Sequence, residues 1–265
     1  MALLSTIRRW CDDHPWQLAG IVFAFLLLIA WIVRADFAMS MDEPPLFAYG
    51  LQAWEYLFNG GPVPPAADWR FHTPLYQFVF IWLAKHLPSD GMLIFGVSRF
   101  VSFLVFSIGW WSLYALARRL TGSHWWALGT VICLTLSPRM FAHAFYNPKD
   151  IPTFAFFTLG VLLLARLMEK RSALRVVLFG LMTGFAISLR PFSLLLPAFA
   201  ALWFGLDWLR APAGEKRPTA LWGLATLAAV LLLTIVVWPR LWSDPIGGLA
   251  GAIFDNTSRS DEGFY

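Results

Sequence analysis

The sequence predicts an all-α, polytopic integral membrane protein. Hydrophobic residues make up 58% of the 265 residues and charged residues only 14%, whereas a soluble domain is near half apolar and about a quarter charged. The mean hydropathy is +0.62. The formal net charge of +4 needs no nucleic-acid partner, because lysines and arginines that orient membrane loops account for it.

Apolar runs of roughly bilayer length, about 17–25 residues, predict about seven transmembrane helices. The runs are Trp16–Val33, Leu93–Ala117, Trp125–Ala144, Ile151–Leu167, Leu174–Leu189, Phe192–Leu206 and Ala220–Val237. No small-residue cleavage site follows the first run, so we expect a retained signal anchor. Only Arg190-Pro191 separates the short fifth and sixth runs, which predicts a tight helical hairpin. Cys11 and Cys133 lie far apart, so no disulfide is expected.

Residues 35–92 form the first predicted non-cytoplasmic loop, which is long for a connection. Within it, Leu46, Gly50, Ala53, Trp54 and Leu57 recur at helical spacing and predict an amphipathic helix on the membrane surface. Asn59-Gly60-Gly61-Pro62 ends this helix. The apolar run from Pro74 to Leu87 is only about 13 residues long, which favours an interfacial or re-entrant helix over a span.

Charge sorting supports a non-spanning Pro74–Leu87 segment. The basic clusters then share one side, as the positive-inside rule requires: Arg8/Arg9, Arg118/Arg119, Arg166/Lys170/Arg171/Arg175 and Arg210/Lys216/Arg217. The other side holds the acidic residues Asp42, Glu43, Asp68, Asp150 and Asp244. An acidic pair and a matching acid at one face predict a reaction site at a bilayer surface.

Asp42 and Glu43 are the first candidate catalytic residues. A solvated loop or the start of a helix at Pro44 accounts for them without chemistry, because acids favour helix N-termini. The functional interpretation is a general base with a helper, since close carboxylates and an interfacial pocket both raise proton affinity. Asp150 precedes a second helix start at Ile151-Pro152, where an N-cap is the structural alternative.

Three arginines, Arg99, Arg139 and Arg190, lie within or at the ends of apolar segments. Intramembrane charge indicates function, although snorkelling to the interface is the alternative. The guanidinium fork suits a lipid phosphate, and Lys149 could bind an anionic group as well. The polar residues His72, His143 and Asn147 belong to the same outer layer. His72 and His143 could ligate a metal with Asp42 or Asp150, but no tight ligand spacing exists.

The order of these motifs resembles that of a known family. The motifs are Asp42-Glu43 followed by Tyr49, Phe71-His72-Thr73-Pro74-Leu75, Ser98-Arg99-Phe100, Pro148-Lys149-Asp150, Ser188-Leu189-Arg190, and Trp238-Pro239-Arg240-Leu241-Trp242 with Asp244-Pro245. They resemble the polyprenyl-phosphate-dependent GT-C glycosyltransferases, namely the protein mannosyltransferase-like proteins of glycosyltransferase family 39 and the lipid A aminoarabinose transferase. Thr73 stands where lysine or proline is usual, and Arg190 replaces a lysine, so aminoarabinose transfer is not implied.

The resemblance implies a GT-C-like fold and inverting transfer of a sugar from a polyprenyl-phosphate donor to a protein or lipid acceptor at the non-cytoplasmic face. It implies Asp42 as base or acceptor-positioning carboxylate, Glu43 as its partner, and Asp150 as the residue that orients the acceptor or a divalent metal. Arg99, Arg190 and Lys149 would hold the donor phosphate. The acceptor or loop site would comprise His72, Asn147 and Arg139. No cofactor is established by the sequence, and a divalent metal stays open.

Residues 1–265 are expected to form a single transmembrane catalytic domain, incomplete relative to the longer family members. The expected location is a bacterial inner membrane, with the active site on the periplasmic or external side. Two other classes stay open. A transporter or lipid flippase also uses intramembrane arginines and outer acids. A non-catalytic half-enzyme that needs a partner subunit agrees with the short length.

Overall fold

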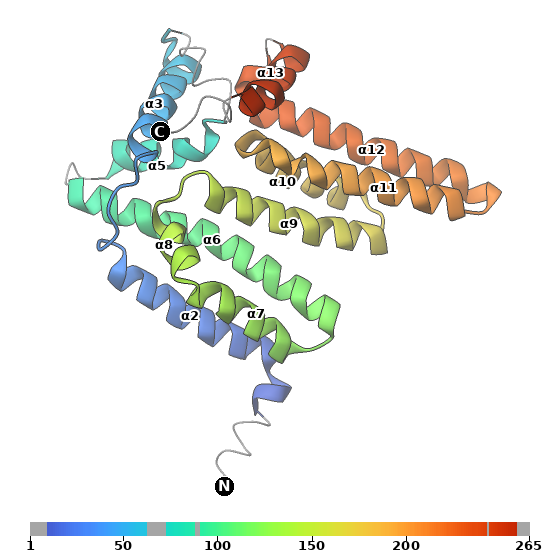
Figure 1. The fold of residues 1–265 in the computed structure, drawn as a ribbon, viewed down its shortest axis with the longest axis horizontal. Helices are drawn as coiled ribbons and strands as arrows, with labels where there is room; N and C mark the ends of the chain where they lie inside the picture. The colour runs from blue at the N-terminus through green and yellow to red at the C-terminus, as the bar shows by residue number, and fades with distance from the viewer. Residues whose placement is uncertain (1–9, 63–72, 88–90, 243, 259–265) are drawn as a thin grey trace.

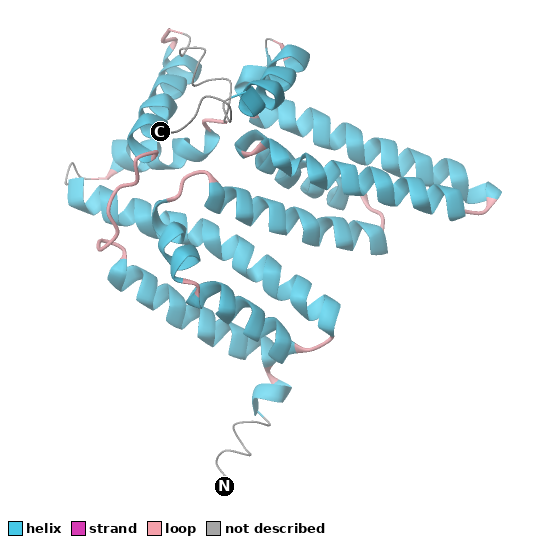
Figure 2. Ribbon diagram, in the orientation of Figure 1, coloured by secondary structure: helices cyan, strands magenta, loops and turns pink. Residues whose placement is uncertain are grey.

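The computed structural model describes residues 10–62, 73–87, 91–242 and 244–258, and every regular element in these ranges is a helix (Figures 1 and 2). His72 and three charged residues used in the charge sorting, Arg8, Arg9 and Asp68, lie outside the described residues. The long helices are α2 (Pro15–Val33), α3 (Glu43–Asn59), α5 (Leu75–His86), α6 (Gly91–Thr121), α7 (His124–Leu136), α8 (Pro138–Tyr146), α9 (Asp150–Glu169), α10 (Ala173–Leu189), α11 (Leu195–Arg210), α12 (Ala213–Val237) and α13 (Pro245–Ser258).

Each predicted span corresponds to helix in the structure. Five helical stretches among the described residues are long and apolar enough to cross a membrane: Pro15–Val33, Leu93–Thr121, Asp150–Glu169, Pro191–Arg210 and Ala213–Val237. A sixth results if α7 and α8 count as one span, and α10 is apolar but has only 17 residues. The predicted all-α, polytopic membrane fold is therefore confirmed.

The predicted span over Trp125–Ala144 is broken into two helices, α7 and α8. The chain bends by 71° between α7 and α8. Ser137 has an extended backbone with ψ 114°, because the ring of Pro138 disfavours helical geometry in the residue before it. The last turns of α8 bury Ala144 and Phe145, and the helix delivers the chain to Asn147.

The predicted amphipathic helix is present as α3. Leu46, Gly50 and Ala53 are buried on one face, together with Tyr49. The helix ends where Gly60 takes a left-handed φ of 69°, a conformation that glycine adopts without a Cβ penalty.

Helix α5 lies against α3 and is too short to be a span. Its 12 residues reach about 18 Å, against a hydrocarbon core of about 30 Å. The two helices are in close contact, since a Cβ added to Gly50 would lie 2.5 Å from the Cβ of Gln77. The length agrees with the predicted interfacial or re-entrant helix.

The remaining helices pack into two apolar groups. Buried aromatic residues such as Phe103 and Trp110 join α2, α6, α7 and α8, while α9, α10, α11 and α12 surround Phe179 and Leu196. Small residues allow the closest approach, which is how membrane helices associate: a Cβ on Gly184 of α10 would lie 2.9 Å from the backbone nitrogen of Thr234 in α12.

The connection between α10 and α11 is as short as predicted. Arg190 has an extended backbone with φ −146°, and a 3-10 turn over Pro191–Leu194 leads directly into α11. Both helices pack against α12. Helix α13 was not predicted from the sequence. It begins at Pro245, and the preceding residue, Asp244, accepts a hydrogen bond from the Gly247 amide (2.9 Å).

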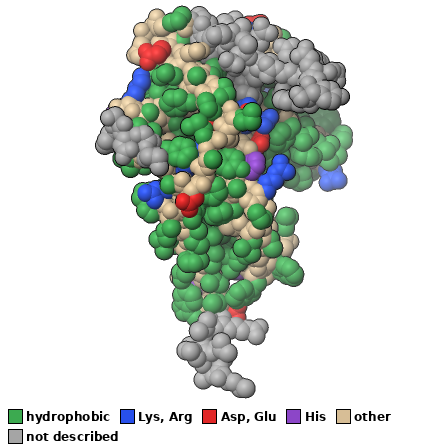
Figure 3. Space-filling view, turned by 60° about the vertical axis from the view of Figure 1, so that its left-hand side comes forward, with side chains coloured by type: hydrophobic (Ala, Val, Ile, Leu, Met, Phe, Trp, Pro, Cys, Tyr) green, Lys and Arg blue, Asp and Glu red, His purple; other side chains and the backbone are tan. Residues whose placement is uncertain are grey.

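Charged residues are sorted between the two ends of the bundle. The start of α9 and the ends of α10 and α12 lie at the same end as α3, α5 and α13 (Figure 1). At the opposite end, ion pairs join Arg119 to Glu169 and Arg171 to Asp207. Hydrophobic side chains cover most of the face seen in Figure 3, and most of the charged ones visible there lie in its upper half.

Candidate functional site

Asp42 occupies the position before the first residue of α3. Its side chain makes no capping hydrogen bond to the helix, although an acid at this position commonly does so. The carboxylate instead faces Lys149, with Oδ2 3.4 Å from Nζ. The side chain of Asp42 is 61% exposed and that of Lys149 only 20%, so the acid remains accessible to a second molecule.

Glu43 is bound to Arg99 through both ends of its carboxylate. Nη1 of Arg99 pairs with Oε1, and Nη2 donates to Oε2 at 2.8 Å. The backbone amide of Ser40 also donates to Oε2 (2.6 Å). Arg99 is only 2% exposed, and its guanidinium lies 4.2 Å from the ring centre of Phe95. Breaking one partner of such a buried pair typically costs about 3–5 kcal/mol.

The segment Asn147–Asp150 folds into a turn around one side chain. The side-chain oxygen of Asn147 accepts hydrogen bonds from the backbone amides of Lys149 (3.1 Å) and Asp150 (2.8 Å). Its amide nitrogen donates to Asp150 Oδ2 at 3.0 Å and lies 2.7 Å from Nδ1 of His143. Asp150 is the first residue of α9, so the N-cap interpretation of Asp150 is wrong; the oxygen of Asn147 does the capping.

Arg190 completes this cluster from the end of α10. Both Nε (3.0 Å) and Nη2 (2.7 Å) donate to Oδ1 of Asp150. Lys149 connects the two acidic groups, since it contacts Asp42 through its side chain and precedes Asp150 in the chain. The fold thus brings together two acids and two cations at one end of the bundle, namely Asp42, Asp150, Lys149 and Arg190.

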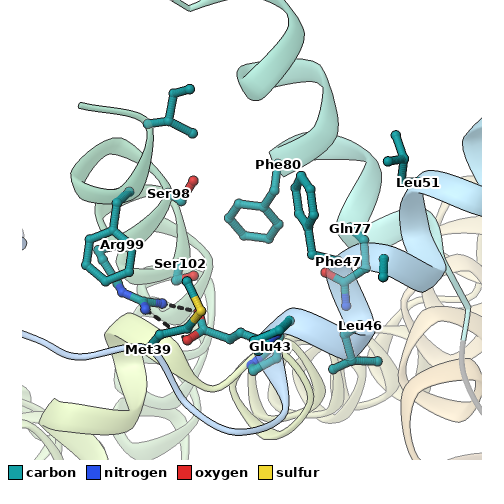
Figure 4. A pocket seen from close by; sticks show the side chains of 15 residues that line it. Met39, Glu43, Leu46, Phe47, Leu51, Gln77, Phe80, Ser98, Arg99 and Ser102 are labelled. Carbon is teal, nitrogen blue, oxygen red and sulfur yellow. Dashed lines mark hydrogen bonds and ion pairs between the residues drawn. The ribbon is translucent and has the colours of Figure 1, made fainter. Parts of the chain in front are cut away.

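An apolar cavity of about 520 Å³ adjoins the acidic pair, which is within the usual range of about 300–1,000 Å³ for small-molecule sites. Its walls come from α3, α5 and α6, and the Glu43–Arg99 pair lies at its edge (Figure 4). The lining residues are Met39, Glu43, Pro44, Leu46, Phe47, Ala48, Leu51, Gln77, Phe80, Ile94, Phe95, Ser98, Arg99, Ser102 and Pro148.

The polar groups next to this cavity carry little net charge. Glu43 and Arg99 neutralise one another, and the remaining polar lining is amide or hydroxyl. Behind it, the Tyr76 hydroxyl lies 3.3 Å from the Ser102 hydroxyl. Burial raises the pKa of Tyr76 to about 12, so this phenol stays neutral. A cavity of this kind favours an apolar chain over a sugar or a free ion.

Arg139, His143 and Thr73 differ in how they relate to this cluster. Arg139 is exposed in the first turn of α8. His143 is in the last turn of α8 and reaches the cluster through Asn147. Thr73, the departure from the family pattern, is buried; its amide donates to the Ser188 carbonyl (2.9 Å) and its hydroxyl to the Val237 carbonyl (2.5 Å). Thr73 therefore anchors the start of α5 to α10 and α12.

The described residues do not fit a divalent metal. No group of three or more His, Cys, Asp or Glu side chains that could hold an ion occurs in the ranges that the structure covers. The oxygens of Asp150 are occupied by Arg190 and Asn147, and hard cations need several free oxygen ligands.

The cavity has no counterpart among the predictions from sequence. Phe47 and Leu51 lie on α3 away from the stripe of Leu46, Gly50 and Ala53, and each is about 40% exposed. This second apolar stripe could have indicated the cavity. When one amphipathic helix has two apolar faces, one face remains to line a binding site.

Comparison with protein families shows a match over much of the chain. The model of the dolichyl-phosphate-mannose-protein mannosyltransferase family matches residues 72–239, well over half of the chain. The matched region contains Arg99, the Asn147–Asp150 turn and Arg190, and it begins after the Asp42-Glu43 pair. Comparison with curated proteins and with solved structures found no match. The chain therefore belongs to the dolichyl-phosphate-mannose-protein mannosyltransferase family.

Proposed function

We propose that this protein transfers a sugar from a polyprenyl-phosphate donor to a protein or lipid acceptor at the non-cytoplasmic face of the membrane. Family membership supports a glycosyltransferase function that uses a polyprenyl-phosphate sugar. The observation that carries the proposal is the exposed carboxylate of Asp42, held beside Lys149 next to an apolar cavity. These are a base, a cation and a lipid-compatible wall at one place.

The proposed reaction is a direct displacement with inversion. Asp42 accepts the proton of the acceptor hydroxyl while the acceptor oxygen bonds to the anomeric carbon of the sugar. The bond between that carbon and the phosphate oxygen breaks, and its electron pair leaves with the polyprenyl phosphate. Phosphate is a good leaving group, so the reaction needs a base and cations more than an acid.

Lys149 and Arg190 are the proposed ligands of the departing phosphate. Both lie beside a carboxylate in the cluster, at 3.4 Å from Asp42 and 2.7 Å from Asp150. Asp150 would orient the acceptor, with Asn147 holding its carboxylate in place. On sequence grounds, Arg139 and His72 belong to the acceptor side as well.

The cavity between α3, α5 and α6 would receive the first isoprene units of the donor. Its lining is mostly apolar, and burial of apolar surface contributes roughly 25 cal/mol per Å². The Glu43–Arg99 pair at the edge of the cavity carries no net charge. The isoprenoid chain can therefore approach Asp42 without meeting an uncompensated charge.

Asp42→Asn tests the proposed base. The amide keeps the shape of the side chain but cannot accept the proton, so transfer from a radiolabelled polyprenyl-phosphate mannose should fall by about 10²-fold or more. Donor binding should change much less. Asp36→Asn, at an exposed acid in the same loop, is the matched control and should keep wild-type transfer. Near-normal turnover in Asp42→Asn would move the role to Glu43 or Asp150.

A leaflet-resolved assay separates the enzyme from a flippase. In the transferase, Arg190→Lys should leave the labelled donor fully exposed on the external leaflet while sugar transfer falls. Retention of the donor on the cytoplasmic leaflet would contradict the proposal and support lipid transport. Transfer by membranes but not by the purified chain would instead identify a half-enzyme that needs a partner.

A further inference from the structure

The contacts of Arg99 point to a role different from phosphate binding. Both terminal nitrogens of its guanidinium are directed at Glu43, and only 2% of the residue is exposed. A phosphate at Arg99 would have to displace Glu43 and leave that carboxylate without its partner. Lys149 and Arg190 are far more accessible, with 20% and 34% of their side chains exposed.

Arg99 also binds backbone on both sides of the candidate site. Nη2 donates to the carbonyl of Ala38 (3.2 Å) and Nη1 to the carbonyl of Phe145 (3.4 Å). The first carbonyl lies shortly before Asp42. The second lies shortly before the turn that begins at Asn147. One buried side chain in α6 therefore connects the two segments that carry the candidate acids.

Glu43 closes the turn that contains Asp42. Its side chain accepts from the Ser40 amide (2.6 Å), and its own amide donates to the Ser40 carbonyl (3.2 Å). The Ser40 hydroxyl donates to the carbonyl of Tyr146 (3.3 Å). Among the described residues, the carboxylate of Asp42 is held by the longer contact to Lys149, so its neighbours set its position.

We propose that Arg99 is a positioning residue, which clamps residues 38–43 through Glu43 and so holds Asp42 at the end of α8. The clamp follows from the contacts alone, while its effect on turnover rests on the proposed sugar transfer. The expected consequence of loosening it is a slower chemical step with unchanged donor affinity, because a misplaced base loses rate without losing binding.

The clamp can be tested without an activity assay. Met41 is 95% exposed and adjacent to Asp42, so a nitroxide on Met41→Cys reports the mobility of this turn. The background replaces Cys11 and Cys133, which are both free thiols, with serine. Arg99→Lys, and independently Glu43→Gln, should increase the mobility of the label at least twofold. Arg190 contacts the Asp150 side of the site, so Arg190→Lys should leave the mobility of the label unchanged.

Kinetics then distinguish positioning from phosphate binding. Under the clamp, Arg99→Lys lowers kcat about tenfold or more with donor KM within twofold, and it adds no further loss to Asp42→Asn. A raised donor KM, and a loss that adds to that of Asp42→Asn, would show that Arg99 binds phosphate. If the mobility of the label is unchanged in both Arg99→Lys and Glu43→Gln, the proposed clamp is wrong. If the parent protein transfers no sugar, the proposed function fails, and the label alone still decides the clamp.

Discussion

At the scale of residues, each candidate carboxylate lies beside a cation of its own. Glu43 is bound to Arg99, Asp42 faces Lys149, and Asp150 is bound to Arg190. The three pairs differ in exposure, because Arg99 is buried while Asp42 and Asp150 each have more than half of the side chain accessible. The buried pair suits a structural role, and the exposed pairs can exchange partners when a phosphate arrives.

Arg190→Lys is expected to weaken transfer about tenfold or more. Arg190 places two nitrogens on one oxygen of Asp150, and a lysine keeps the charge but loses the second donor; a charge-assisted hydrogen bond contributes roughly 1.5–3 kcal/mol. The measurement is kcat/KM with a polyprenyl-phosphate mannose. Arg217→Lys, an exposed arginine at the opposite end, is the control. Equal rates in both variants would remove Arg190 from the phosphate site.

Sequence reasoning could identify the residues of the site but not their pairing. Asp42, Glu43, Asp150 and Arg190 stand out because charge beside apolar runs is rare. Arg99 stands out for the same reason, yet its partner lies 56 positions away in the chain. Which cation meets which acid depends on how α6, α8 and α10 pack, and no local spacing encodes that.

At the scale of elements, apolar length predicts the existence of helices better than their continuity. The helices over the predicted spans are present, and the end of α3 at Gly60 follows from local chemistry. The bend at Ser137 was readable in principle from Pro138, but proline also occurs inside continuous membrane helices, as Pro218 does in α12. Helix α13 starts beyond the last predicted span and lacks a comparable apolar run.

Gly184→Ala should destabilise the contact between α10 and α12. The new Cβ would lie 2.9 Å from the Thr234 nitrogen, which is backbone and cannot rotate away. Overpacking typically costs about 1–3 kcal/mol, more than the roughly 0.5–1 kcal/mol by which alanine favours helix over glycine. The thermal midpoint in detergent should fall. Gly205→Ala in α11 meets nothing within 4 Å and should not lower it; a fall in both would point to a general glycine effect.

At the scale of the whole molecule, the charges separate into two ends. The cluster of Asp42, Lys149, Asp150 and Arg190 lies at the end with α3 and α5 (Figure 1). The Arg119–Glu169 and Arg171–Asp207 pairs lie at the other end. This arrangement agrees with the sorting of lysine and arginine in the sequence, because the bilayer separates two compartments along the helix axes.

A topology experiment tests that arrangement. A reporter fused after Arg119 should read cytoplasmic, and one fused near Asn59 should read external. The reason is that α6 begins near the acidic cluster and ends at the basic end of the bundle. Reporters at both positions in the same compartment would contradict a shared outer face for Asp42 and Asp150.

The hydrogen bonds of Thr73 have a consequence for the order in which the protein is made. Its hydroxyl is bound to the carbonyl of a residue 164 positions later, and at about 5–20 residues per second the ribosome needs roughly 8–33 s to reach it. During that interval the hydroxyl of Thr73, at the start of α5, has no anchor on α12. In a stalled chain that ends before Val237, protease should therefore cut at the start of α5, while the completed chain protects this site. The start of α5 is thus synthesised early but gains its hydrogen bond to α12 only late in synthesis.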